Sequence, residues 1–349
     1  MTNVFLFHVP QVELQVGELR IDPEVSLMTK ERAVECLKDA NVLSEWIDLF
    51  ETGRMKDGDN LTALGVIPGR GSTFLVFRDN RDDVSDWIVQ EKLNFFALSQ
   101  VGYRGRATRA FVSNFGARSL AKRFSTGENI NIRLTVGNQA AAPRLAIDDV
   151  WKNWQEKNGY WFDLIKQLNP RKNGVPKKEE WASKWRDRLR RAGIFLGKSF
   201  NSSVRSDALL WNMVAIEIIL VARGKDTREQ LKTNVGLFFR ADDEKRVEIE
   251  EGLQRCYDLR NDFVHKGLVN RIETKDVILT DYILFNLFYN IARNPTDFSS
   301  AEAISSFAEK VEAANILGIR PEDHVPMLKI VSLPDYEKVD SLKQEVFDH

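Results

Sequence analysis

An arginine and a histidine near the end of one amphipathic segment are the residues in this chain best suited to chemistry. Arg260 falls on the apolar face of a helix expected over residues 244–264, and His265 follows where the chain reaches Gly267. A guanidinium does not lose its proton, so packing it against apolar residues is costly unless an anion meets it there. A cation that binds phosphate, beside an imidazole that transfers protons, is the minimum set of groups for cleaving a phosphodiester.

Two further apolar helices are expected beside this one, over residues 206–222 and 276–292. The first carries a single acid, Glu217, so that two helices close in sequence place opposite charges on otherwise apolar faces. Together the three helices indicate a small helical bundle. The buried face of the helix over residues 244–264 is expected to consist of Ile249, Leu253, Cys256, Tyr257, Phe263 and Val264.

Residues 205–293 resemble a HEPN domain and, within that superfamily, the Apea-like HEPN group. The resemblance rests on Ala215-Ile216-Glu217 in the earlier helix and on the run from Cys256 through Arg260-Asn261 to Val264-His265-Lys266-Gly267. The family motif is arginine, a polar residue and, a few positions later, histidine. Arg260, Asn261 and His265 match it residue by residue, and Glu217 corresponds more loosely to a polar position on the earlier helix. The resemblance covers about a quarter of the chain.

This resemblance implies a four-helix bundle that forms a homodimer, with both copies of the motif meeting at the interface. It also implies metal-independent cleavage of RNA in the catalytic members, and a setting in bacterial defence or toxin action. The candidate catalytic residues are then Arg260, His265, Asn261 and Glu217, with Lys266 as a neighbouring RNA contact. No cofactor and no metal ion are expected.

The chemistry of RNA cleavage explains why these residue types are needed. Attack by the 2′-hydroxyl requires a base for its proton, an acid for the leaving 5′-oxygen and a cation for the charge that grows on phosphorus. Histidine serves either proton role, and arginine binds two phosphate oxygens at once. A two-fold dimer would bring two copies of His265 and of Arg260 together, leaving 2′,3′-cyclic phosphate and 5′-hydroxyl ends.

A structural interpretation stands beside the catalytic one. Arg260 would neutralise Glu217 in the bundle core, and His265 would sit at a helix C-terminus, where a cation is favoured. The protein would then be a non-catalytic RNA-binding or dimerising scaffold. An Arg260–Glu217 pair sealed within one subunit favours this alternative, whereas an open cleft shared with a second subunit favours the enzyme.

The composition bounds the remaining possibilities. The chain has 349 residues, 43% of them hydrophobic and 29% charged, as in an ordinary globular protein of two or three domains. No signal peptide is recognised, and the longest apolar run, residues 208–222, is too short to span a bilayer. Cys36 and Cys256 are the only cysteines, so neither a disulfide framework nor a thiolate metal site is expected. We therefore expect a cytoplasmic protein without a membrane partner.

The net charge of −1 conceals two basic segments. Residues 171–191 hold nine basic side chains against three acids, and residues 101–127 hold six basic side chains and no acid. Such segments are typical of proteins that bind the phosphate backbone, and Arg186, Arg190, Arg104 and Arg106 are the candidate RNA contacts. The alternative for the first segment is the solvated face of a helix, because Trp181, Trp185 and Leu189 recur every four residues.

The first 150 residues differ from the rest in their pattern of apolar and turn residues. Short β-prone runs at residues 4–7, 12–16, 73–77, 110–112 and 130–136 are separated by turn residues, with one helix expected over residues 29–50. We expect an α+β protein: a mixed, mainly antiparallel β domain over residues 1–150 that senses a trigger ligand or protein, a helical connector with a basic segment over 151–200, a HEPN-like bundle over 201–318 and a tail over 319–349. The β-prone run at residues 327–331 would add an edge strand or lie across a partner chain.

Overall fold

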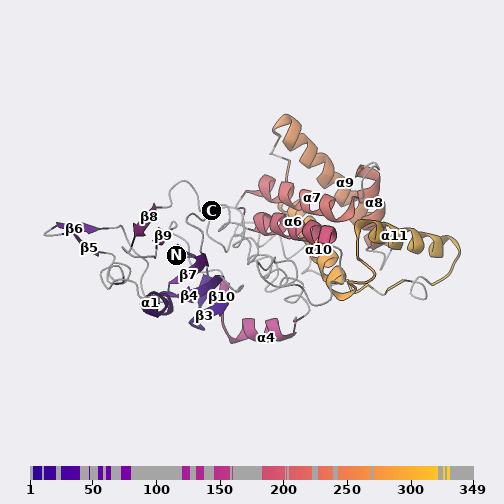
Figure 1. The fold of residues 1–349 in the computed structure, drawn as a ribbon. Coiled ribbons are helices and arrows are strands. Elements are labelled where there is room, and N and C mark those ends of the chain that lie inside the picture. The colour runs from indigo at the N-terminus through magenta and orange to yellow at the C-terminus, as the bar shows by residue number, and fades with distance from the viewer. Residues whose placement is uncertain are drawn as a thin grey trace. The chain divides into compact units, whose positions relative to one another are not determined.

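The computed structural model describes residues 3–9, 12–20, 25–39, 47, 54–57, 60–63, 72–79, 120–125, 131–136, 145–157, 159, 183–200, 202, 204–221, 227–238, 243–268, 271–320, 325–326 and 328–330. The described residues up to Lys157 and those from residue 183 onward form two compact units. The first is built on a β-sheet and the second is a bundle of helices (Figure 1). The predicted α+β fold class is confirmed.

The N-terminal unit contains a six-stranded sheet with the strand order β3-β4-β7-β1-β9-β8. Its strands are β1 (Asn3–His8), β3 (Glu18–Arg20), β4 (Val25–Thr29), β7 (Thr73–Asp79), β8 (Leu120–Ser125) and β9 (Asn131–Val136). Neighbouring strands are antiparallel except β1 and β9, which are parallel. The sheet is therefore mixed and mainly antiparallel, as the sequence predicts. Two small sheets accompany it, β2 (Val12–Leu14) with β10 (Leu145–Ile147) and β5 (Arg54–Asp57) with β6 (Asn60–Ala63).

Burial runs continuously along the central strands of this sheet. Phe74, Leu75 and Val76 of β7 are all buried, as are Val25 and Leu27 of β4. Both faces of the strands are therefore covered, since successive side chains of a strand point to opposite faces. Helix α1 (Lys30–Asp39) contacts β4 and β7, and strand β2 contacts the same pair.

The predicted runs at residues 4–7, 12–16, 73–77 and 130–136 coincide with β1, β2, β7 and β9. The run at residues 110–112 lies outside the described residues. The helix predicted for residues 29–50 is observed over Lys30–Asp39 and again at Ile47, with the intervening and following residues outside the described part. The predicted connector, residues 151–200, divides between the two units. Helix α4 (Asp149–Lys157) contacts β10, whereas α6 (Ser183–Phe200) packs in the bundle.

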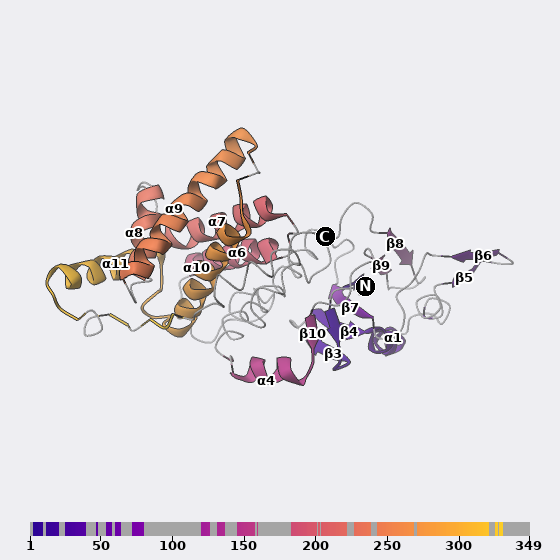
Figure 2. The same ribbon diagram turned by 180° about the vertical axis from the view of Figure 1, so that it is seen from behind.

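Helix α7 is the centre of the C-terminal unit (Figures 1 and 2). Besides α6, the helices of this unit are α7 (Arg205–Leu220), α8 (Thr227–Phe238), α9 (Asp243–Lys266), α10 (Thr274–Arg293) and α11 (Ala301–Ile316). Helix α7 contacts each of the others. Its side chains Leu209, Met213, Ile216 and Leu220 are fully buried, so α7 is an apolar central helix of the kind that the run at residues 206–222 predicts.

The carbonyl groups at the C-terminus of α7 accept hydrogen bonds from two neighbouring helices. The Arg188 guanidinium of α6 donates to the carbonyl oxygens of Ile218 and Val221. The Asn234 amide of α8 donates to the carbonyl oxygen of Leu220 at 2.9 Å. These are the groups that a helix end leaves without partners. Arg188 therefore has a structural role, which neither the RNA-binding nor the solvated-face interpretation of residues 171–191 gives it.

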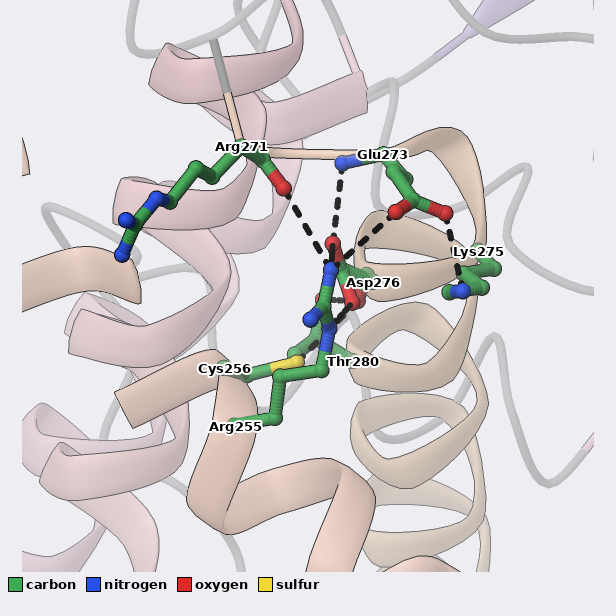
Figure 3. Close-up of polar contacts among 7 residues, drawn as sticks. All are labelled: Arg255, Cys256, Arg271, Glu273, Lys275, Asp276 and Thr280. Atoms are coloured by element: carbon green, nitrogen blue, oxygen red, sulfur yellow. Dashed lines mark hydrogen bonds and ion pairs between the residues drawn. The ribbon is translucent and has the colours of Figure 1, made fainter. Parts of the chain in front are cut away.

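A polar network joins α9 to the start of α10 (Figure 3). At its centre is Asp276, which is only 3% exposed. Its carboxylate accepts from Arg255 Nε at 2.9 Å and from the backbone N–H of Glu273 at 2.8 Å. The Arg255 guanidinium also reaches the carbonyl oxygen of Arg271 at 3.3 Å. Because the buried carboxylate has a charged donor and a backbone donor, it fixes the middle of α9 against the start of the next helix.

The β-prone run at residues 327–331 was expected to add an edge strand or to lie across a partner chain. Its described part, residues 328–330, is not in a strand. The backbone of Lys329 instead pairs with a side chain of α10. Asn290 Nδ2 donates to the Lys329 carbonyl oxygen at 3.1 Å, and the Lys329 N–H donates to Asn290 Oδ1 at 2.9 Å. An amide side chain presents the same donor and acceptor pair as a neighbouring strand, which explains why a β-prone segment is held beside a helix.

We expect Arg255→Ala to lower the free energy of unfolding by about 1–3 kcal/mol, because it leaves the buried carboxylate of Asp276 without its charged partner. Arg228→Ala is the matched control. Arg228 pairs with Asp258 at 3.3 Å and both side chains are more than half exposed, so its loss should cost less than about 1 kcal/mol. Urea denaturation of the two variants measures the difference, and equal losses would contradict the central role given to Asp276.

Candidate active site

The last turn of α9 carries the histidine of the candidate site. Ile249, Leu253 and Cys256 line the buried face of the helix, as predicted, and burial raises the pKa of the Cys256 thiol. The prediction that Val264 belongs to this face is wrong, since Val264 is 50% exposed. The final turn of α9 extends beyond the helices that cover its middle, which leaves Val264 and His265 in solvent (Figure 1).

Gly267 ends the helix directly after these residues. Its φ of 69° lies in the left-handed region, and its N–H donates to the carbonyl oxygen of Phe263 at 3.0 Å. This is the helix ending that glycine favours, because a side chain at this φ is strained. Gly267 therefore determines where α9 ends, and His265 lies two residues before this glycine.

Arg260 lies between α9 and α7. Its Nη2 is 3.4 Å from Glu217 Oε2, and its Nη1 donates to Asn261 Oδ1 at 3.0 Å. Both side chains of the ion pair are 22% exposed. Among the described residues, Glu217 Oε1 and Arg260 Nε are buried and have no hydrogen-bond partner. The guanidinium is thus held by two neighbours without having all its hydrogen-bonding capacity used.

Burial governs the protonation of the acid in this pair. Loss of water raises the pKa of the Glu217 carboxyl, and the charge of Arg260 opposes that rise. The ion pair is contained in one chain, but it is not sealed from solvent. The pairing within one chain is the feature expected of the scaffold, whereas the shared cleft expected of the enzyme requires a second subunit and stays a prediction.

The imidazole of His265 lies next to the same group of residues. His265 follows Asn261 by four positions, so the two side chains share one face of α9, and the Arg260 guanidinium reaches this face through Asn261. His265 makes no hydrogen bond or ion pair with any described residue. The other described histidine, His8 of β1, is buried, and burial lowers its pKa to about 4. Of these two histidines, only His265 is placed to exchange protons with a molecule from solvent.

The remaining predicted contacts are distributed unequally. Lys266, beside His265, forms an ion pair with Asp262 at 2.8 Å, and Arg271 lies 3.8 Å from the same carboxylate. Asp262 was not predicted as part of the site, although its spacing of four residues from Lys266 is the usual signal for such a pair. It places a negative charge beside the predicted phosphate contact. Arg186 and Arg190 are half-buried on α6 and make interactions within the chain. Arg104 and Arg106 lie outside the described residues.

The described part of the chain contains no group of three or more His, Cys, Asp or Glu side chains that could hold a metal ion. None of its helices combines the length and the apolar character needed to cross a bilayer. The side chains that α7 and α9 bring together here are a carboxylate, a guanidinium and an amide, with an imidazole one turn further along α9.

The raised pKa of Glu217 predicts a pH dependence of stability. A carboxyl whose folded pKa is raised above its usual value of 4.5 stabilises the fold below that pH, and this contribution is lost as the pH rises through the folded pKa. Glu217→Gln keeps the size of the side chain and does not titrate. We expect the wild type to lose stability relative to this variant as the pH rises above 4.5, measured by urea denaturation across pH. A constant difference between the two proteins would show that Glu217 is not desolvated in the fold.

Comparisons with known proteins identify no relative of this chain. No family model matches the chain, and neither does any curated protein or solved structure. The HEPN-like interpretation therefore rests on the motif and on the arrangement of Arg260, Asn261, His265 and Glu217.

Proposed function

We propose that the protein is a metal-independent endoribonuclease of HEPN type, with Arg260 and His265 as its principal catalytic residues. The observation that carries the proposal is the way in which Arg260 is held beside His265. Its guanidinium is partly exposed and is held by Glu217 and Asn261, and the exposed imidazole of His265 lies one turn from Asn261. A fixed cation and a free imidazole at one helix end are the two groups that phosphodiester cleavage requires.

Arg260 would bind the non-bridging oxygens of the scissile phosphate. These oxygens gain negative charge as the 2′-oxygen attacks, and donors that are already oriented stabilise that charge without reorganisation. Glu217 and Asn261 serve as positioning residues, because they contact the guanidinium and hold its plane. Glu217 also sets a limit on this role, since its carboxylate offsets part of the positive charge.

His265 would transfer the protons. One imidazole cannot readily accept the 2′-hydroxyl proton and protonate the leaving 5′-oxygen in the same step, so a second copy is needed. We propose that two chains form a symmetric homodimer through the end of α9, which supplies two imidazoles and two guanidinium groups. Val264 and Leu268, both large apolar side chains exposed beside His265, support a contact at this place.

The wider setting is what the resemblance to HEPN proteins implies. We propose that the enzyme acts in the cytoplasm on cellular or phage RNA as part of a defence or toxin response. The N-terminal sheet unit would then receive the trigger, either a ligand or a protein. Lys266 would contribute to RNA binding next to the cleavage site, with its charge partly balanced by Asp262.

A second candidate is a non-catalytic RNA-binding or dimerising scaffold. The observation in its favour is that Arg260 and Glu217 pair within one chain. In this case the ion pair stabilises the packing of α7 against α9, and His265 is an exposed side chain at a helix end. The two candidates predict opposite results for a substitution at His265.

We expect His265→Ala to lower the rate of RNA cleavage by about 10²–10⁴-fold, the usual cost of removing a proton-transfer group. Thermal stability should not change, because His265 is exposed and makes no hydrogen bond or ion pair with a described residue. Purified protein is incubated with total RNA in EDTA, and Glu251→Ala, an exposed position on the same helix, serves as the control. Wild-type cleavage by the His265 variant would exclude the imidazole from the reaction.

We expect Arg260→Lys to lower cleavage by on the order of 10²-fold although the charge is kept, because a planar fork orients two phosphate oxygens and an ammonium does not. The matched control is Arg228→Lys, which makes the same exchange at an exposed ion pair. Single-turnover rates on a defined RNA separate the chemical step from binding. Full activity of the Arg260 variant would mean that the guanidinium does not touch the phosphate.

A further inference from the structure

The exposed face of α6 carries a line of basic side chains. Lys184, Arg191 and Lys198 follow one another at intervals of seven residues, so they lie along one side of the helix over about 20 Å. Lys184 and Arg191 are exposed and Lys198 is half-buried. The same face holds one acid, Asp187, whose carbonyl oxygen accepts a long hydrogen bond from Arg191 Nε at 3.4 Å. The face is therefore positively charged.

An aromatic pair lies at one end of this line. Phe195 of α6 and Trp211 of α7 are stacked, with ring centroids 5.5 Å apart and planes inclined by 18°. Both side chains are half-buried, so part of each ring remains accessible. The pair joins the two most closely associated helices of the bundle, and neither residue was a predicted site residue.

Lys198, the last basic residue of this line, lies over both aromatic rings. Its ammonium lies 5.3 Å from the centroid of Phe195 and 4.9 Å from that of Trp211. It forms no ion pair with a described acid, so its contacts within the described chain are with the two aromatic faces. An ammonium held in this way keeps its charge available for an anion from solvent.

We propose that this face of α6 binds single-stranded RNA, with phosphates on Lys184, Arg191 and Lys198 and an unpaired base stacked against Phe195 and Trp211. The inference rests on the proposed function for the identity of the nucleic acid. Basic residues interleaved with accessible aromatic rings are the combination that single strands require, because only unpaired bases offer their faces for stacking. An acidic peptide would satisfy the charges and leave the rings unused.

The position of Trp211 links this surface to the candidate active site. Trp211 and Glu217 lie on α7 six residues apart, which corresponds to about 9 Å along the helix axis. The same six positions turn the two side chains about 120° apart around α7, with Trp211 toward α6 and Glu217 toward α9. A strand that binds across Trp211 would therefore have to continue around α7 to reach Arg260.

Fluorescence anisotropy of a labelled oligo-uridylate tests the proposal, with the full-length His265→Ala protein used throughout so that the probe stays intact. The double substitution R191A/K198A and the single substitution F195L are compared with K310A, which removes one charge from the exposed face of α11. We expect F195L to weaken binding by about 5- to 100-fold. R191A/K198A should weaken it and also reduce its dependence on salt. K310A should have little effect.

Equal affinity for a duplex of the same length, or for poly-glutamate, would overturn the inference, and so would unchanged binding by both α6 variants. Far-UV circular dichroism and thermal unfolding confirm that F195L is folded, and R191A/K198A tests the site independently of the aromatic pair. The two proposals fail separately. Loss of single-strand binding in the α6 variants by a protein that never cleaves RNA would support this site and refute the nuclease. Cleavage that needs His265 with α6 variants that bind normally would do the reverse.

Discussion

A guanidinium that cannot be neutralised lies half-buried between two apolar helices, and the candidate site depends on how that charge is accommodated. Arg260 meets the carboxylate of Glu217 on α7 and the amide of Asn261 on its own helix. Burial disfavours the charged form of Glu217, and Arg260 restores part of that loss. Each charge would be energetically costly in this partly buried place without the other, so each fixes the other's position.

The bundle is arranged so that this pair has a rigid frame. Helix α7 is surrounded by apolar contacts, and its C-terminal carbonyls, one turn beyond Glu217 or less, are capped by Arg188 and Asn234. Helix α9 is fixed to α10 through Arg255 and the buried carboxylate of Asp276 (Figure 3). The Leu279 side chain of α10 also packs directly over Gly252 of α9. The last turn of α9, beyond this frame, is left free to contact another molecule.

Much of this frame could be predicted from the sequence because its signals are local. Apolar periodicity located α7, α9 and α10 to within a few residues, and Gly267 marked the end of α9. The pairing of Glu217 with Arg260 followed from two opposite charges on otherwise apolar faces.

What could not be predicted depends on contacts between residues distant in sequence. The structural role of Arg188 was not predicted, because its partners, the carbonyls of Ile218 and Val221, lie at the end of another helix. The β-prone segment around Lys329 was expected to add an edge strand or to lie across a partner chain, and its partner in the described residues is the side chain of Asn290. Val264 fits the apolar period of α9, but no described helix covers that turn, so a periodic pattern alone could not reveal its exposure.

The proposed reaction is attack of the RNA's own 2′-hydroxyl on the adjacent phosphate, without a metal ion. Its most direct test is end-group analysis on an RNA oligonucleotide that the wild-type protein cuts in EDTA, compared with the same oligonucleotide carrying one 2′-deoxy nucleotide at the cut. We expect 2′,3′-cyclic phosphate and 5′-hydroxyl ends from the RNA, and no cleavage at the deoxy position. Efficient cleavage of the deoxy-substituted position, or 5′-phosphate ends that form only when a divalent cation is added, would contradict it.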